Sequence, residues 1–325
     1  MKLLTLSAED LRRALPMPEA VAAMKDAFVA LSTGRASSPP RGVVDVEPGE
    51  GTTLLMGAYV ANTGLATKIV SVFPGNAQRG RPVVNALVLV LDPRTGEPVA
   101  LCDGTYLTAL RTGAASGAAT DLLARGDARV AAVIGCGVQA RTQASAIDSV
   151  RQLDEIRVCG RRSESAGRLV DEMRGRTRAR LVAVDSSEEA VRDADIVCTA
   201  TDSHAPVFDG TLLAPGTHVN GVGSFKLEMQ EVDTETVRRS RVFVDSVEAA
   251  LAEAGELVIA ERDGVTSSDR WTEIGLVAAG RAEGRRSDSE VTFFKSVGHA
   301  VQDVAAASRA LGVARESGLG KEIEL

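Results

Sequence analysis

Three small residues at the spacing Gly135-x-Gly137-x-x-Ala140 give the clearest chemical signal in this chain. They follow an apolar run from Val130 to Ile134, which is typical of a strand buried on both faces. In such a turn the first glycine allows a tight bend, the second lets the backbone approach a pyrophosphate, and the alanine lets the next helix pack closely on its strand. The spacing therefore predicts a dinucleotide site at the N-terminus of a helix.

The residues of this turn and of the helix start are the predicted cofactor contacts. They are Gly135, Gly137, Val138, Gln139 and Ala140. A strand, turn and helix that bind no nucleotide would show the same glycines. A second apolar strand from Glu155 to Cys159 follows the helix, as a βαβ unit requires, and this favours the nucleotide site.

The end of that second strand indicates which dinucleotide is bound. In an NAD site an Asp or Glu about twenty residues after the glycines accepts hydrogen bonds from the ribose. Here the strand ends in Arg161, Arg162 and Ser163. Guanidinium groups bind phosphate oxygens with a planar fork, so we expect NADPH to be preferred over NADH. The alternatives are that both arginines are solvated loop charges, or that the nearby Glu164 faces the ribose.

Three cations in the N-terminal part stand in settings that are poorly suited to solvated charges. Arg41 follows two prolines, Lys68 interrupts an apolar strand, and Arg111 lies in a helix of small residues. Desolvated cations need an anion. A protein carboxylate such as Asp103 could supply it, and so could a bound carboxylate, because arginine binds carboxylates bidentately. The residue types leave both possibilities open.

The elements that must position these residues indicate two domains of different architecture. In the first part, short strands alternate with tight turns, which predicts a mostly antiparallel sheet. Between about residues 120 and 292, strands alternate with helices, which predicts a doubly wound parallel sheet of Rossmann type. A strand from Asp195 to Thr201 would end beside the cofactor, so Thr199 and Thr201 are further expected cofactor contacts.

The composition excludes several classes of function. The net charge of −7 argues against nucleic acid as a partner. The 4 cysteines and 3 histidines are scattered, so we expect neither a disulfide framework nor a metal site. The sequence lacks a long apolar run and a secretory signal at its start, so we expect a cytoplasmic protein without membrane contact.

Taken in order, the motifs of the whole chain resemble the ornithine cyclodeaminase/μ-crystallin family. The resemblance is carried by Lys68 in its strand, by the segments 72–76, 91–96 and 103–113, by the Gly135 turn, and by the segments 220–223 and 294–298. It implies an α/β fold with a Rossmann domain at 119–296 and an α+β substrate-binding and dimerisation domain at 1–118, joined by a C-terminal helix at 297–325. It also implies a homodimer.

The resemblance assigns roles residue by residue. Arg41, Lys68 and Arg111 match the positions that hold a substrate α-carboxylate, and so are expected to be catalytic and substrate-binding residues. Thr112 matches a position near the cofactor phosphates. The positions that line the nicotinamide and the substrate are Asn220, Val222 and Ser296.

One departure from the family pattern separates its members. Cyclodeaminases carry an aspartate where this chain has Phe225, which lines the expected substrate site and cannot accept a proton or pair with an ammonium group. The following segment also differs from the family, so a shift of the alignment would allow Glu228 or Glu231 to replace the aspartate. Phe225 instead gives an apolar wall that suits a compact ring.

The sequence therefore predicts an NADPH-dependent reductase of a cyclic imine 2-carboxylate, either Δ1-pyrroline-2-carboxylate or Δ1-piperideine-2-carboxylate. The alternatives are an ornithine or lysine cyclodeaminase, an alanine-type amino-acid dehydrogenase, and a non-catalytic NADPH-binding protein like μ-crystallin. The proton donor is open between Lys68 and an ordered water. The ring size and the physiological direction are open too.

Overall fold

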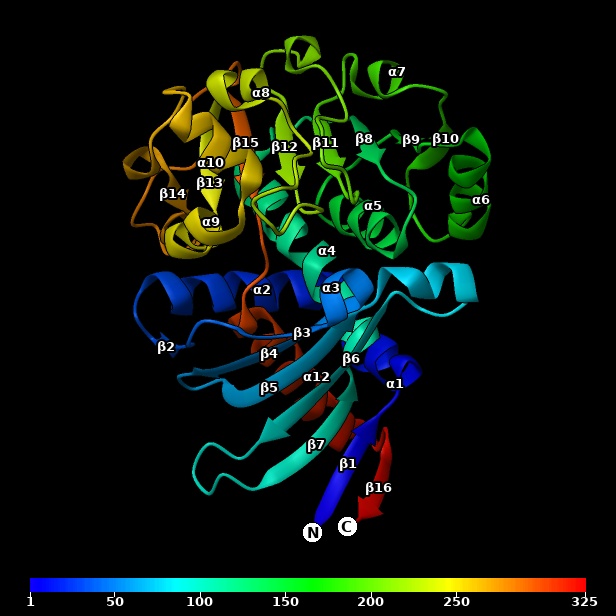
Figure 1. Cartoon of the computed structure of the whole chain (residues 1–325), viewed down its shortest axis with the longest axis vertical. Coiled ribbons are helices and arrows are strands. Elements are labelled where there is room, and N and C mark those ends of the chain that lie inside the picture. Colours follow the sequence, from blue (N-terminus) through cyan, green and yellow to red (C-terminus); the bar gives the residue numbers. More distant parts are fainter. The chain divides into compact units, whose positions relative to one another are not determined.

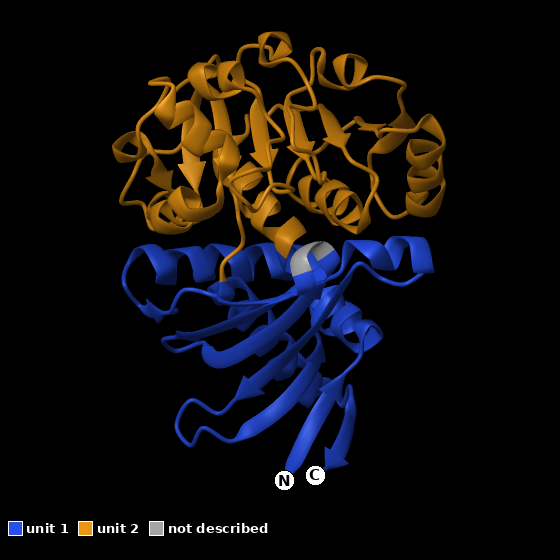
Figure 2. Cartoon of the chain, in the orientation of Figure 1, with its two compact units in different colours: residues 1–111, 300–325 blue, residues 112–299 orange. Residues whose placement is uncertain are grey.

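The computed structural model describes residues 1–47 and 50–325 and divides the chain into two compact units (Figure 2). Unit 1 comprises Met1–Arg111 and Ala300–Leu325, and unit 2 comprises Thr112–His299. The sequence placed the functional domains at 1–118 with 297–325 and at 119–296, and these limits stay a prediction.

Unit 1 is built on one mixed sheet in the order β16-β1-β7-β6-β5-β4-β2, with β3 paired to β4. The neighbours β4 to β7 are antiparallel, as predicted, whereas β1 and β7 are parallel. The strands are β1 (Lys2–Leu6), β2 (Ala36–Ser37), β3 (Gly42–Val46), β4 (Gly51–Val60), β5 (Gly64–Val72), β6 (Val84–Leu91), β7 (Pro98–Asp103) and β16 (Lys321–Glu324).

Helix α12 covers one face of this sheet. It crosses β4, β5 and β6 and packs against α2 (Figure 1). The helix approaches β5 closely, because a Cβ on Gly64 would lie 2.3 Å from the Oγ of Ser308. The helices of the first part and of the C-terminal return are α1 (Ala8–Ala14), α2 (Met17–Ser32), α3 (Glu47–Glu50), the 3-10 helix η1 (Pro74–Arg79), α4 (Gly104–Leu123) and α12 (Ala300–Ser317).

The opposite face of the unit 1 sheet carries exposed apolar side chains. In register, Leu55 of β4 lies opposite Ile69 of β5, which lies opposite Leu87 of β6. These three residues, here called the apolar row, are each about half exposed, at 46%, 48% and 51%. Strand alternation explains the pattern, because the residues on either side of them point to the face that α12 covers.

Unit 2 is a doubly wound parallel sheet in the order β10-β9-β8-β11-β12-β15-β13-β14, and every neighbouring pair is parallel. The predicted Rossmann fold class is confirmed. The strand order reverses beside β8, which is where open α/β sheets bind their ligands. The strands are β8 (Val130–Ile134), β9 (Glu155–Cys159), β10 (Arg180–Ala183), β11 (Ile196–Thr199), β12 (His218–Gly221), β13 (Ser240–Val244), β14 (Thr272–Glu273) and β15 (Val291–Lys295).

Apolar side chains on both faces of the central strands hold the sheet of unit 2 together. Val197, Val219 and Phe293 belong to one core cluster, whereas Ile156 and Ile196 belong to another. Strands that are apolar on both faces need helices on both sides. These helices are α5 (Val138–Val150), α6 (Ser163–Met173), α7 (Ser187–Val191), η2 (Gly210–Leu212), α8 (Thr234–Arg239), α9 (Val247–Glu253), α10 (Gly255–Arg262), η3 (Ser268–Arg270) and α11 (Ile274–Ala278).

Within the described residues, the helices are all too short or too polar to cross a membrane.

Candidate functional site

The turn between β8 and α5 has the geometry that a dinucleotide site needs. Gly135 has a φ of 121°, and a Cβ at this position would lie 2.3 Å from the backbone oxygen of Ala200. Only glycine fits such a bend. Gly137 is the N-cap of α5 and has no side chain to cap the helix, so the first N–H groups of α5 can serve a phosphate.

The remaining residues of the turn suit a ligand as well. Val138 is 65% exposed, and Gln139 is half-buried. Ala140 is completely buried against the sheet, which brings the start of α5 close to β8. The five predicted residues therefore come together in one turn that fits the pyrophosphate of a nicotinamide dinucleotide.

The tip of β9 carries exposed charges of both signs. Arg161 and Asp202 form an ion pair of 3.1 Å in which both side chains are 85% exposed. Such a pair contributes little, so a ligand phosphate can replace the carboxylate. The Oγ of Ser163 donates to Asp185 over 3.0 Å, and Arg162 is the exposed N-cap of α6. Sequence reasoning missed both aspartates, since they follow other strands.

The hydroxyl groups of two predicted cofactor contacts donate to a carboxylate of the protein. Thr199 donates its hydroxyl to Glu231 over 3.0 Å, and Thr201 does so over 2.8 Å. Thr112 is buried, and its backbone oxygen accepts a hydrogen bond of 3.3 Å from Gln143. For these three residues contact with a cofactor stays a prediction.

The predicted nicotinamide-lining residues follow or end the central strands of unit 2. Asn220 is fully buried and donates from Nδ2 to the Oγ1 of Thr120 over 3.0 Å, so its side chain already has a partner inside the unit. Val222 is 9% exposed. Ser296 is nearly buried and donates to Asp245 over 2.8 Å. Their contacts with substrate stay predictions.

The histidine nearest to these residues is unsuited to acid–base chemistry. His218 lies in β12, and its Nε2 contacts the Oδ1 of Asn220 at 3.2 Å. Burial lowers the pKa of His218 to about 3, so the ring is neutral at physiological pH.

A buried ion cluster in unit 1 joins two of the three predicted cations. The Nζ of Lys68 lies 2.6 Å from the Oδ2 of Asp303, and the Nε of Arg111 lies 3.2 Å from the Oδ1 of the same residue. Arg111 also donates to the Oε1 of Gln302 over 2.6 Å. All four side chains are 8% exposed or less.

The carboxylate in this cluster differs from the one that the sequence suggested. Asp103 instead accepts a hydrogen bond of 2.9 Å from the backbone N–H of Tyr106 at the start of α4. Asp303 lies on α12, 235 residues after Lys68. Its signal in the sequence was an acid among the small apolar residues at the start of a C-terminal helix, whose other acid, Glu316, lies near the end of the helix.

The charged groups around Lys68 act on its pKa in both directions. Burial lowers the pKa of Lys68 to about 8, Asp303 opposes this shift, and the positive charges of Arg111 and Arg41 add to it. Arg41 therefore lies within electrostatic range of Lys68. Lys68 and Arg111 share the carboxylate of Asp303, and a bound carboxylate would be attracted to such a pair of buried cations.

Comparison of the whole chain with known proteins shows its family. The sequence model of the ornithine cyclodeaminase/mu-crystallin family matches residues 1–317. The chain belongs to this family. Its sequence is 37% identical to a Delta(1)-pyrroline-2-carboxylate reductase of Bacillus cereus, over 99% of this chain and 100% of the relative.

Two solved structures are similar over their full length. One is Delta(1)-pyrroline-2-carboxylate reductase of Thermococcus litoralis in complex with NADH and L-proline, with 39% identity, a TM-score of 0.95, and coverage of 99% of this chain and 100% of that one. The other is an archaeal alanine dehydrogenase dimer with bound NAD, with 35% identity, a TM-score of 0.92 and complete coverage of both chains.

The segment that starts at Phe225 is where the sequence analysis separated cyclodeaminases from other members of the family. Phe225 is half-buried. Glu231 is completely buried, and its carboxylate is surrounded by donors, so it is unable to replace the missing aspartate. Glu228 is exposed, and its backbone oxygen lies 2.9 Å from the Nδ1 of His204. A catalytic role for Glu228 stays a prediction.

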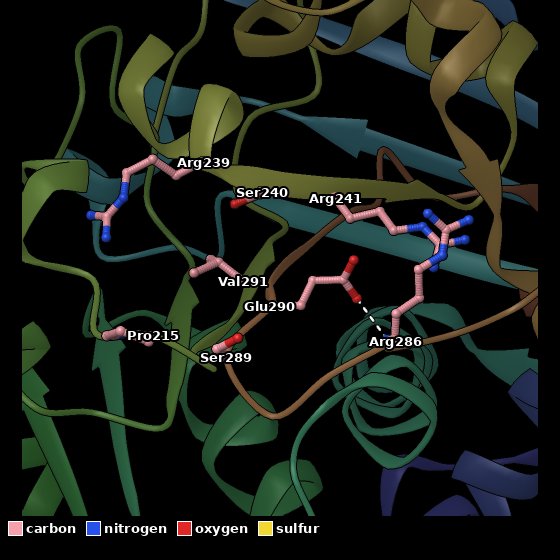
Figure 3. Close-up of a pocket in the computed structure, with 8 residues that line it drawn as sticks. All are labelled: Pro215, Arg239, Ser240, Arg241, Arg286, Ser289, Glu290 and Val291. Atoms are coloured by element: carbon pink, nitrogen blue, oxygen red, sulfur yellow. Dashed lines mark hydrogen bonds between the residues drawn. The ribbon is translucent and has the colours of Figure 1, made fainter.

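A separate hollow of about 520 Å³ lies where β13 and β15 begin, the opposite edge from the Gly135 turn (Figure 3). Its arginines are engaged by the protein. Arg239 donates to the backbone oxygen of Leu213 over 2.9 Å, and Arg241 donates to that of Glu283 over 2.8 Å. This hollow is therefore a poorer candidate than the Gly135 turn.

The described residues also contain no group of three metal ligands.

The ion cluster gives a prediction about stability. Changing Asp303→Asn leaves Lys68 and Arg111 buried without a counter-charge, so we expect the free energy of unfolding to fall by about 3–5 kcal/mol. Urea unfolding followed by circular dichroism measures the loss. The matched control is Glu322→Gln, which breaks the exposed pair with Lys2 and should cost less than about 1 kcal/mol. Equal losses for both variants would contradict the assignment.

Proposed function

We propose that this protein is an NADPH-dependent reductase of a cyclic imine 2-carboxylate, with Δ1-pyrroline-2-carboxylate or Δ1-piperideine-2-carboxylate as substrate. The observation that carries the proposal is the pair of buried cations, Lys68 and Arg111, that share the carboxylate of Asp303 in a chain that also has the Gly135 turn. The names of the B. cereus and T. litoralis relatives support the reaction class.

Each residue of the cluster has a task in this reaction. Arg41 and Arg111 bind the substrate carboxylate, and Lys68 contributes its charge to the same group. NADPH, when bound, would supply the hydride that the imine carbon accepts. The imine nitrogen must gain a proton as the double bond becomes single, and we assign this proton to the ammonium group of Lys68.

The substitution at the cyclodeaminase aspartate supports a reductase over a cyclodeaminase. Ring closure from ornithine needs a group that handles the side-chain amine, and Phe225 lacks any proton-accepting atom. Reduction of a preformed ring needs a carboxylate clamp, a hydride and a proton. An apolar wall at Phe225 is compatible with all three.

The direct test is an assay with the purified protein, NADPH and Δ1-pyrroline-2-carboxylate or its six-membered homologue. We expect the absorbance of reduced nicotinamide to fall and proline or pipecolate to form. Ornithine with NAD, and pyruvate with ammonia, are the comparison substrates. Ammonia release from ornithine would indicate a cyclodeaminase, and faster turnover of pyruvate with ammonia would indicate an alanine dehydrogenase. Tight NADPH binding without turnover would indicate a binding protein.

The assignment of the proton donor predicts a pH dependence. Burial lowers the pKa of Lys68 to about 8, so kcat/KM for imine reduction should fall above about pH 8, as the ammonium group loses its proton. Proline oxidation needs the neutral amine and should instead rise through the same range. The variant Lys68→Arg keeps the positive charge but releases no proton in this range, so its plot of kcat/KM against pH should lack the fall above about pH 8. A wild-type profile that is flat between about pH 7 and 9 would exclude Lys68 as the donor.

We further propose that this chain prefers NADPH to NADH, although its relatives were solved with NADH and NAD. The support is the pair of exposed guanidinium groups at the tip of β9. Arg161→Asp should shift the ratio of dissociation constants towards NADH by about tenfold or more, because it places a carboxylate near the ribose. Fluorescence titration measures both constants. Arg174→Asp, at the far end of α6, is the control. Equal affinity of the wild type for both cofactors would refute the preference.

The apolar row supports a homodimer formed through the sheet of unit 1. Leu55, Ile69 and Leu87 form an apolar patch of the kind that marks an interface, and the similar alanine dehydrogenase was solved as a dimer. Leu87→Lys should give monomers in analytical ultracentrifugation, because it places a charge within the interface of both copies. The control Leu251→Lys changes a residue of α9 that is 42% exposed, and should stay dimeric. A wild-type monomer, or a dimeric Leu87→Lys variant, would exclude this interface.

A further inference from the structure

One buried carboxylate joins three segments at the ligand-binding edge of unit 2. The Oε1 of Glu231 accepts hydrogen bonds from the backbone N–H of Thr201 over 2.6 Å and from its hydroxyl over 2.8 Å. The Oε2 accepts from the hydroxyl of Thr199 over 3.0 Å and from the N–H groups of Gly223 and Ser224 over 2.6 Å and 3.3 Å. Glu231 thereby ties the end of β11 to the segment that follows β12.

A second set of buried charges holds the same segment from its other side. The hydroxyl of Ser224 donates to Glu256 over 2.7 Å, and the Nζ of Lys295 donates to the backbone oxygen of Ser224 over 2.7 Å. Lys295 and Glu256 form an ion pair of 3.0 Å. Glu231, Ser224, Glu256 and Lys295 are each 1% exposed or less.

The backbone between these anchors is closely packed and fully hydrogen-bonded at Ser224. A Cβ on Gly223 would lie 2.1 Å from the backbone oxygen of Thr201 and 2.5 Å from Glu231. The N–H, the carbonyl and the hydroxyl of Ser224 are all bonded to buried charged groups. Phe225 directly follows Ser224, so the position of its backbone is set by the hydrogen bonds of Ser224.

We propose that Glu231 is a positioning residue that fixes Phe225 and thereby sets the preference for cyclic over open-chain imines. This inference rests on the proposed function, because it takes Phe225 as the apolar wall of the substrate site. Glu231 acts without touching substrate, through its bonds to Gly223 and Ser224. Buried polar networks of this kind specify one arrangement when every member has a partner.

The variant Glu231→Gln tests the inference while preserving size. In the glutamine side chain an NH2 group replaces one of the two carboxylate oxygens. This NH2 group would face N–H and O–H donors, so the hydrogen bonds on that side would be lost. Hydrogen exchange followed by mass spectrometry should show the amides of Gly223 and Ser224 exchanging about tenfold faster or more. The ratio of kcat/KM for Δ1-pyrroline-2-carboxylate to that for pyruvate with ammonia should fall about tenfold, since a loosened wall no longer favours the ring.

The control is Glu248→Gln, the same change at an exposed position of α9, which should alter neither measurement. Faster exchange in Glu231→Gln with an unchanged substrate ratio would reduce Glu231 to a structural role and overturn the inference. Unchanged exchange would overturn it as well. If Glu231→Gln fails to fold, Ser224→Ala removes one anchor hydroxyl and must show the same two changes in smaller degree.

The failure of the proposed function can be told apart from the failure of this inference. A wild-type protein that reduces neither substrate contradicts the proposed function. The substrate preference inferred for Phe225 is then contradicted as well, even if Glu231→Gln speeds hydrogen exchange at the Gly223 amide. A wild type that reduces the cyclic imine, with a ratio that Glu231→Gln leaves unchanged, contradicts only the positioning role.

Discussion

The chemistry proposed for this chain depends on keeping positive charge inside a protein. Lys68 and Arg111 are almost fully buried, and removing such groups from water costs several kcal/mol for each ion. Asp303 offsets part of this cost by forming ion pairs with both cations. Burial still lowers the pKa of Lys68 to about 8, so the pairing with Asp303 offsets this cost only in part. In the proposed function, the two cations that Asp303 stabilises also bind the substrate carboxylate.

Unit 2 shows the opposite arrangement, in which buried carboxylates hold backbone rather than attract a ligand. Glu231 binds the ends of two segments, and Asp245 accepts from Ser296, Val297 and Gly298. Each acid follows a strand or lies near a strand end. Buried carboxylates that bind backbone N–H groups hold the neighbouring residues in fixed positions. The proposed reaction needs such fixed residues, because the substrate ring must be oriented before it reacts.

The parts of the fold that follow from neighbouring residues were predictable from the sequence. The Gly135 turn is specified by residues within six positions of one another, and the apolar strands of unit 2 by their continuous runs. Lys68 was recognisable because a cation interrupts a strand. Asp303, by contrast, reaches Lys68 only when α12 lies on the sheet. The hydrogen bonds from Thr199 and Thr201 to Glu231 likewise join residues that are distant in sequence and meet only in the folded chain.

Because Lys68 and Asp303 are far apart in sequence, they leave the ribosome at different times. During synthesis, β5 leaves the ribosome well before α12, so the ammonium group of Lys68 lacks its partner carboxylate until almost the whole chain has been translated. A contact between residues so far apart in sequence also requires the long intervening loop to be closed, which costs conformational entropy. Unit 1 is thus completed by the last helix to emerge, and an incomplete chain that stops before α12 lacks the acid on which its buried cations depend.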